Sequence, residues 1–387
     1  MINMKKINTL FLIGILLSST WLLSGCWNYK EVEQLSIVSG ATIDMVEKDK
    51  VLVTVEIISV KQDPKQSALE PVYIQAIGDT FFDAVRQMVA VQGKRLYWSH
   101  AKVIVLGEEV AKRGVSHVLD FLNRDAEIRE DMWVLLSREN TASAIFYAKP
   151  ETESIQAYEL DYTLRAQKAI SRYPAVELYR FLDMISSKNT TAILPTLKLI
   201  YERGKTTTYV TGSAIIKSDK LIGYLNEQES KSLLWIREEL KGGLFVVRNA
   251  GKVGIDVTLE INKSKTEIKP FVEDNKLIMK VYVDVDVNIA EIMGREDFIS
   301  EDGRNSLKKE AEKQIKKSLD NLIEKSQKEL KADLFGFGET IERSIPGIPE
   351  NIIEDWDEFF IDLETLVDVN VTITGSGTSK TPVKVGK

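Results

Sequence analysis

The chain has 387 residues, 44% hydrophobic and 28% charged, a composition that excludes disordered and fibrous proteins and can supply two or three hydrophobic cores. The 51 Lys and Arg against 58 Asp and Glu give a net charge of −7 without a basic block beyond one Lys-rich helix face, so no nucleic-acid partner is expected. One cysteine and two histidines argue against disulfide frameworks, metal sites and most classes of enzyme, and we expect no metal and no cofactor.

The N-terminal segment has the pattern of a lipoprotein signal peptide. Two lysines precede an apolar run over 10–23, which is short for a transmembrane helix. The run closes with a Leu-Ser-Gly-Cys tetrapeptide that resembles a bacterial lipobox. We expect residues 1–25 to be cleaved off between Gly25 and Cys26, and two acyl chains on Cys26 to hold the mature chain at a membrane lipid surface. The alternative is an apolar helix with an incidental buried cysteine.

Residues 26–204 are predicted to form an N-terminal mixed α/β domain. Alternating apolar residues predict a strand pair over 37–43 and 51–59, followed by a polar stretch over 61–71. A helix follows, and Thr80 with Asp83 can form a capping box at its start.

A strand-helix-strand unit over 102–136 comes next, with its helix over 108–122 and its two strands expected to be parallel. The polar residues 151–172 predict a linker or an extended excursion, and a helix is expected over 174–186 with a proline in its first turn.

A break in composition near residue 205 predicts a boundary, and 205–262 is expected to be a small middle α/β domain. It would hold a hairpin that turns at 218–220 and a helix over 227–240 that ends at a Gly-Gly pair.

The C-terminal part, 263–387, has the cleanest periodicity. Apolar residues alternate over 281–289 and over 367–373, which predicts two strands with one buried face each. A helix over 304–331 has one apolar stripe and lysines opposite. This pattern predicts an α+β domain in which a long helix packs on an antiparallel sheet.

Two groups of residues are candidates either for docking a partner or for a structural role. One is a charged cluster at a helix end, in which a capping and ion-pair network competes with partner docking. Its members are Asp120, Arg124, Asp125, Glu127 and Arg129. The other is the pair Phe335 and Phe337 in a Phe-Gly-Phe-Gly segment, where helix termination and packing compete with an exposed aromatic anchor.

Three further residues have ordinary structural alternatives. Trp27, next to the acylated cysteine, fits the headgroup level of a membrane as well as it fits domain packing. His100 and His117 lack a third ligand, which makes a metal site improbable on spacing alone, and adjacent Ser99 and His100 side chains on a strand would face opposite ways.

Many residues in the same order resemble one family across the chain. After the cysteine these are Trp27, Glu31, Leu35, Val38, Gly40, Ile43 and Asp44. The middle block contains His100, Ala101, Gly107, Glu108, Ala111, Gly114, Leu119, Asp120, Arg124, Asp125, Glu127, Ile128 and Arg129. Farther on come Gly212, Gly223, Leu225, Glu229, Leu233, Trp235, Gly242-Gly243, Ala290-Glu291-Ile292, Ala332-Asp333, Phe335-Gly336-Phe337-Gly338 and Trp356. On these positions the chain resembles the Ger(x)C family, the lipoprotein C subunits of nutrient germinant receptors in endospore-forming bacteria. It departs from the family pattern at Asn28 and at Ala41-Thr42.

The resemblance implies three mixed α/β domains after the signal peptide and no enzymatic activity. It implies a complex with two integral-membrane partners, the A and B receptor subunits, at the outer face of the spore inner membrane. There the receptor senses small nutrients and triggers germination, and the resemblance assigns no residue to contact with the germinant. The alternative function is a lipid-anchored extracytoplasmic solute-binding protein, which would need two lobes around a cleft. An anchored hydrolase would need a nucleophile and a base that no spacing in this sequence designates.

Overall fold

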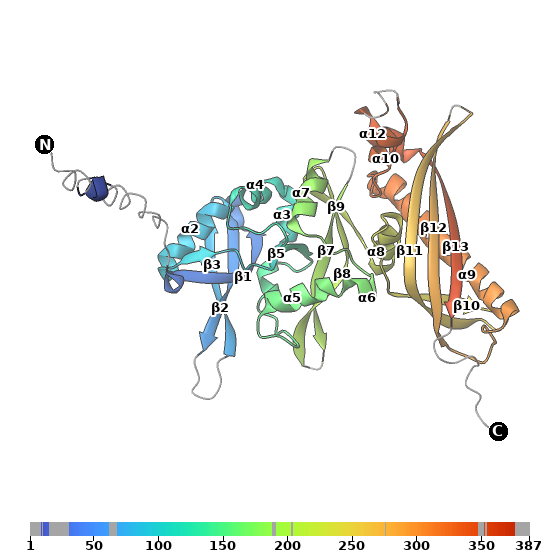
Figure 1. Ribbon diagram of the computed structural model, residues 1–387, viewed down its shortest axis with the longest axis horizontal. Helices are drawn as coiled ribbons and strands as arrows, with labels where there is room; N and C mark the ends of the chain where they lie inside the picture. Colours follow the sequence, from blue (N-terminus) through green and yellow to red (C-terminus); the bar gives the residue numbers. More distant parts are fainter. Residues whose placement is uncertain are drawn as a thin grey trace, which may run out of the picture.

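The computed structural model describes residues 9, 11–14, 31–61, 68–187, 191–202, 204–274, 276–346, 352 and 354–375. The strands in this part of the chain form two sheets, one of nine strands and one of four, with helices packed against both (Figure 1). Within the described residues, no helix has both the length and the apolar character needed to cross a membrane. The expected mixed α/β architecture is confirmed.

The first sheet has the strand order β3-β2-β1-β5-β6-β7-β8-β9, and β4 pairs with β1 beside this path. Its strands are β1 (Leu35–Met45), β2 (Val51–Lys61), β3 (Ala68–Gly78), β4 (Arg95–Tyr97), β5 (Val103–Leu106), β6 (Trp133–Ser137), β7 (Ala192–Glu202), β8 (Lys205–Lys217) and β9 (Lys220–Leu225). The central strands β1, β5, β6 and β7 are parallel, and an antiparallel meander extends the sheet on each side.

Helices cover both faces of the centre of this sheet, which is why β5 is apolar at every position and β6 at every position except Ser137. Ile104 and Leu106 face α2 (Phe81–Gln92), α3 (Glu108–Arg113), α4 (Ser116–Arg124) and α7 (Leu178–Ser186). Val103 and Val105 face the other side, where α5 (Gln156–Arg165) packs. Figure 1 shows α2, α3, α4 and α7 on one side of the sheet and α5 on the other.

The parallel pairing of β5 with β6 is confirmed, but the helix expected over 108–122 is two helices. Gly114, with φ of 135°, ends α3. The β8–β9 turn docks into the break, where the carbonyl of Asp219 accepts a hydrogen bond from the N–H of Val115 and its carboxylate accepts one from Ser116 Oγ. A turn that is distant in sequence therefore contacts the break between the two helices.

Residues 151–172 are not the linker that their polarity predicted. They contain α5 and α6 (Gln167–Ile170), because Ala157, Leu160 and Leu164 recur at helical spacing and are all buried against the sheet. The next helix, α7, begins at Leu178 and not at 174, since the preceding segment is extended and the carbonyl of Val176 accepts a hydrogen bond from the N–H of Val134 in β6.

The second sheet has the order β10-β11-β12-β13. Its strands are β10 (Leu244–Ala250), β11 (Ile255–Glu273), β12 (Lys276–Ile292) and β13 (Glu364–Gly375). The long helix α9 (Glu301–Glu324) lies across one face, with Leu307, Ala311 and Ile315 in the core. The expected long helix on a sheet is confirmed; the sheet is antiparallel from β10 to β12, while β13 runs parallel to β12 because α9 forms the crossover between them.

The two sheets are joined through α8 (Glu227–Ile236), which follows β9 and packs against α9 and β11. Residue 205 lies at the turn between β7 and β8, two strands that pair within the first sheet, and 205–262 contributes strands to both sheets. The strand pairing is thus continuous across the expected boundary, and the division of the chain into three folding units stays a prediction.

Candidate functional site

The residues of the expected cleavage and lipidation site, Gly25 and Cys26, lie outside the part of the chain that the structure describes, as does Trp27. Their roles stay predictions.

The charged cluster predicted at residues 120–129 is a set of separate surface pairs. Arg124 Nε donates to both carboxylate oxygens of Asp120 at 2.9 Å, and these side chains are 75% and 62% exposed. Glu127 accepts a hydrogen bond from Arg95 Nη2 at 2.7 Å, and Arg129 pairs with Asp131. Asp125 caps the turn by accepting the N–H of Glu127. These residues consequently form three separate ion pairs and one turn hydrogen bond, and they do not form a single network.

The two phenylalanines of the Phe-Gly-Phe-Gly segment are buried. Phe335 and Phe337 have ring centroids 5.0 Å apart and are 6% and 0% exposed, and Phe337 also contacts Phe360 in α12 (Trp356–Ile361). Gly336 adopts a φ of 74°, a conformation that lets the chain turn into α10 (Phe337–Ser344). This geometry supports packing of the two rings. The expected helix termination by the glycines is wrong, because the helical chain that continues α9 ends at Leu330 with Lys331 as its C-cap, and Gly336 precedes the start of α10.

The carboxylate of Asp333, two residues before Phe335, organises this junction. It accepts hydrogen bonds from the backbone N–H groups of Phe335, Gly336 and Gly338 and from Trp356 Nε1. The residue is 2% exposed, and burial raises the pKa of its carboxyl to about 6 although these donors oppose the shift.

Arg237, just after α8, is the cation of the same junction. Its guanidinium donates to the carbonyl oxygens of Leu334 and Thr191, and the N–H of Thr191 donates to the carbonyl of Asp333. Burial lowers the pKa of Arg237. Because Thr191 precedes β7 and Leu334 follows α9, these bonds connect the first sheet to the second.

Two buried carboxylates in the first sheet also accept hydrogen bonds from backbone N–H groups of other segments. Glu56 in β2 accepts the N–H groups of Gln156 and Ala157 at the start of α5 and the hydroxyl of Ser39. Asp44 in β1 accepts the N–H groups of Ala142 and Ser143. Burial raises the pKa of both carboxyls. The sequence indicated Asp44 only through the family pattern, and it gave no signal for Glu56 beyond a polar position in a strand.

A cleft of about 740 Å³ opens between the start of β6, α5, α6, α7 and the segment after α8. We call it the charged cleft. Its charged lining residues are Asp131, Glu177, Glu238 and Glu239 and Arg165, Lys168, Arg180 and Lys241. The two signs are equal in number, so the lining has no net charge.

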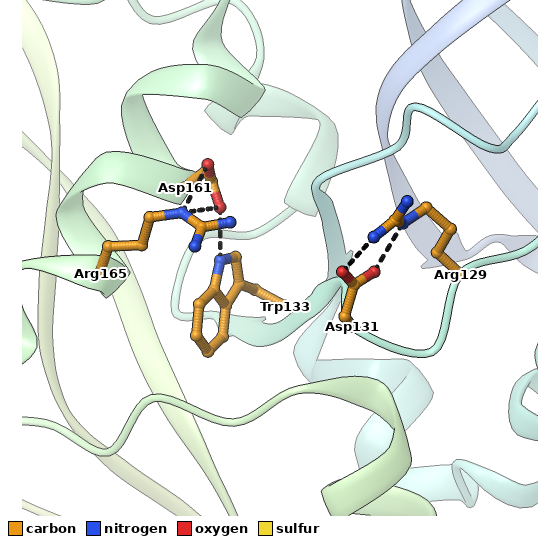
Figure 2. Close-up of polar contacts among 5 residues, drawn as sticks. All are labelled: Arg129, Asp131, Trp133, Asp161 and Arg165. Atoms are coloured by element: carbon orange, nitrogen blue, oxygen red, sulfur yellow. Dashed lines mark hydrogen bonds and ion pairs between the residues drawn. The ribbon is translucent and has the colours of Figure 1, made fainter.

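Trp133 lines the charged cleft, and Figure 2 shows its indole ring between two ion pairs, Asp161 with Arg165 and Asp131 with Arg129. Asp161 accepts the indole N–H at 2.7 Å and also the Nε–H of Arg165, whose guanidinium carbon lies 6.0 Å from the centre of the indole ring. The hydrogen bond to Asp161 raises the pKa of Arg165. The bond between Arg129 and Asp131 borders the opposite side. Of these residues only Arg129 was a candidate from the sequence, and the cleft could not be predicted because its walls come from segments that are far apart in the chain.

Both histidines are exposed, and within the described residues no group of three or more His, Cys, Asp and Glu side chains is placed to hold a metal ion.

Two family models match this chain in sequence order. The spore germination protein N-terminal domain matches residues 28–199, and the spore germination B3/GerAC-like C-terminal domain matches residues 211–377.

Individual proteins of similar length match as well. The chain is 27% identical to spore germination protein B3 of Bacillus subtilis (strain 168), over 92% of this chain and 95% of that protein. It is 24% identical to spore germination protein KC of the same organism, over 96% of both chains. Among solved structures, the crystal structure of the GerBC protein has a similar fold, with a TM-score of 0.56 and 24% identity over 89% of this chain and 100% of that one.

Proposed function

Because the chain belongs to the spore germination family of GerAC-like proteins, the C subunits of germinant receptors, we propose that it is a lipid-anchored, non-catalytic subunit that takes part in triggering spore germination. The observation that carries the proposal is the match of both family domains, in order, across nearly the whole chain. The fold shared with the GerBC protein agrees with it.

The anchor rests on the sequence around Cys26. An apolar run, small residues and the single cysteine of the chain coincide there, which is the arrangement that lipoprotein processing requires. Two acyl chains would hold the protein durably at a bilayer, because each buried methylene contributes about 0.8 kcal/mol. The mature chain would then lie on the outer face of the spore inner membrane.

Replacing Cys26 by alanine tests the anchor. Without the thiol no diacylglycerol can be attached, so the variant should take up no palmitate analogue during metabolic labelling and should keep its signal segment, since lipidation precedes cleavage. Labelling of Cys26→Ala at the wild-type level would show that the anchor is elsewhere or absent.

The partners in this proposal are the integral-membrane A and B subunits. The surface pairs at residues 120–129 are available for docking because their side chains reach solvent, whereas the burial of Phe335 and Phe337 favours a structural role for those two. Rim charges of this kind affect association more than folding.

A charge reversal distinguishes docking from architecture at this surface. The variant Arg124→Glu should melt like the wild type, and if the surface docks a membrane subunit, it should retain less of that subunit in a pull-down from solubilised spore membranes. The exposed pair of Lys316 and Asp320 on α9 offers a matched control, Lys316→Glu. Equal retention by wild type, Arg124→Glu and the control would place docking elsewhere.

A non-catalytic role agrees with the buried ionisable groups of the two sheets. The carboxylates of Glu56, Asp44 and Asp333 each accept hydrogen bonds from backbone N–H groups, so all three have a structural role.

A further inference from the structure

The proposed anchor lies close in sequence to the first sheet. Glu31, the first described residue after Cys26, follows it by five positions, a reach of at most about 18 Å even for a fully extended chain. The chain then enters β1 at Leu35, at one end of the elongated molecule, while the second sheet lies at the other end (Figure 1). Acyl chains on Cys26 would therefore hold the end that contains β1 at the bilayer.

Helix α2 lies beside this point of entry. Leu35 in β1 pairs with Arg95 in β4, the strand that follows α2 in the chain. Ser36 Oγ also donates a hydrogen bond to Gln92 Oε1, at the last residue of α2, at 2.9 Å. Because paired strands lie about 4.8 Å apart, the C-terminal end of α2 is held next to the residues that lead to Cys26.

The exposed side of α2 carries apolar and cationic side chains. The helix packs its other side against the first sheet and α4. Val91 is 71% exposed and Phe82 is 42% exposed, and the guanidinium carbon of Arg86 lies 4.8 Å from the centre of the Phe82 ring. Apolar and cationic side chains on one helix face are typical of helices that lie on a lipid surface. We call these exposed residues, with the exposed lysine that follows the helix, the α2 face: Phe82, Arg86, Ala90, Val91 and Lys94.

The two cations of the α2 face are available to an external anion. Arg86 and Lys94 make no ion pair with any residue that the structure describes. The carboxylate of Asp83, on the same helix, instead accepts a hydrogen bond from a backbone N–H just before the helix. The exposed acids Glu31 and Glu33 lie in the segment before β1 and not on the helix. The α2 face therefore offers two positive charges to lipid phosphates.

We propose that the α2 face lies on the headgroups of the lipid bilayer in which Cys26 is anchored. Ala90 and Val91 enter the headgroup region, and Arg86 and Lys94 contact lipid phosphates. This inference rests on the anchor proposed above and adds to it the orientation of the protein on the membrane. Because the anchor confines this end of the chain to the bilayer surface, the local concentration of lipid is high and a small contact area is enough to orient the protein.

Fluorescence quenching in vesicles tests the proposal on the full lipidated chain. Cys26 is the only cysteine and its thiol would carry the lipid, so Val91→Cys supplies a single free thiol for an environment-sensitive fluorophore. The vesicles consist of phosphatidylglycerol and phosphatidylcholine with a lipid that is spin-labelled at the headgroup. The probe should lose about half of its fluorescence or more, because interfacial helices lie about 5–10 Å deep at the headgroup boundary.

The matched control is Val253→Cys, between β10 and β11 of the second sheet. Its side chain is 73% exposed, against 71% for Val91, so the two probes differ in position and not in access to solvent. The control probe should keep its fluorescence. Equal quenching of both probes, or no quenching at Val91→Cys, would refute the proposed orientation.

Charge reversal tests the role of the cations. Arg86→Glu combined with Lys94→Glu should reduce quenching of the Val91→Cys probe by about half or more, since each basic residue near an anionic surface is attracted to it. The control combines Lys309→Glu with Lys317→Glu, which reverses two exposed lysines of α9 that also lack an ion pair within the described chain. Unchanged quenching in the first variant, or an equal reduction in the control, would contradict the contact with lipid phosphates.

Sedimentation with the vesicles separates this inference from the anchor itself. A chain that sediments with the vesicles while its Val91→Cys probe stays unquenched would retain the anchor and refute the orientation. An α2 face that docks a membrane protein instead of lipid would give this same result, because the vesicles contain lipid alone. A chain that does not sediment would refute the anchor, and the orientation with it.

Discussion

Replacing Asp333 by alanine should lower the free energy of unfolding by about 3–5 kcal/mol, the range expected when a buried charged network loses one member. Its carboxylate receives four hydrogen bonds: from the N–H of Phe335 at 2.9 Å, Gly336 at 3.0 Å and Gly338 at 2.9 Å, and from Trp356 Nε1 at 3.2 Å. Each donor left buried without an acceptor costs about 1–3 kcal/mol, and Arg237 also loses the countercharge of Asp333. Local relaxation keeps the total below the sum of these costs.

Urea unfolding of the full chain in detergent, followed by tryptophan fluorescence, measures this loss. The matched control is Asp362→Ala, which removes an 84% exposed carboxylate from its surface pair with Lys328 and should cost less than about 1 kcal/mol. A loss below about 1 kcal/mol for Asp333→Ala, or an equal loss for the control, would refute the role given to this junction.

The pH dependence of the free energy of unfolding gives a second test of the role of Asp333. Burial raises the pKa of Asp333 to about 6, above its ordinary value of 3.8, so between these values the folded state binds more protons than the unfolded state. The contribution of this group to stability is therefore fully present below pH 3.8 and falls as pH rises toward 6. Asp333→Asn does not titrate, so the stability of the wild type relative to this variant should fall over that window and then level off. A difference that grows with pH would contradict the raised pKa.

Three further outcomes follow from the contacts of single side chains. Glu56→Ala should lower the free energy of unfolding by about 3 kcal/mol, because the N–H groups of Gln156 and Ala157 and the hydroxyl of Ser39 lose their acceptor. A loss under about 1 kcal/mol in urea unfolding would contradict this reasoning. Arg237→Met should lower the free energy of unfolding by about 3–5 kcal/mol, because it breaks the hydrogen bonds to the carbonyls of Leu334 and Thr191 and leaves Asp333 without its cation. A melting temperature equal to that of the wild type would refute this prediction. Arg124→Glu should change the free energy of unfolding by less than about 1 kcal/mol, because its pair with Asp120 is exposed, and a loss above about 2 kcal/mol in thermal melting would contradict the surface assignment.

Strands that bury one face and expose the other could be predicted from the sequence, because their apolar and polar residues alternate. Val281, Val283 and Val285 alternate with polar residues, and this period of two places β12 within a few residues of its observed bounds. The pairing direction of β13 could not be read from the same pattern, because an alternating strand has the same signal in parallel and antiparallel pairs.

Helix α5 was missed for a different reason. The segment is polar overall, and its buried residues Ala157, Leu160 and Leu164 form a stripe too narrow to stand out from its charged neighbours. The start of α5 is fixed by Glu56, a hundred residues earlier, so a tertiary contact determines the bounds of this helix.

The candidate site was predictable only where it is local in sequence. The Phe-Gly-Phe-Gly segment indicated packing, which is present, and a helix end, which lies earlier at Leu330, while the segment itself contains the start of α10. The charged cleft could not be predicted, since it brings together Trp133, Arg165, Glu177 and Glu239 from separate elements, and no spacing within one segment encodes that arrangement.

The central claim is that the chain is a subunit of a germinant receptor. The most direct test is affinity purification of the tagged full-length chain from detergent-solubilised spore membranes, followed by mass spectrometry of the proteins that copurify. The receptor assignment predicts that two integral-membrane proteins, the A and B subunits, accompany the wild-type chain, and that the recovered chain begins at a diacylated Cys26. Recovery of an unlipidated chain without these membrane proteins would contradict it.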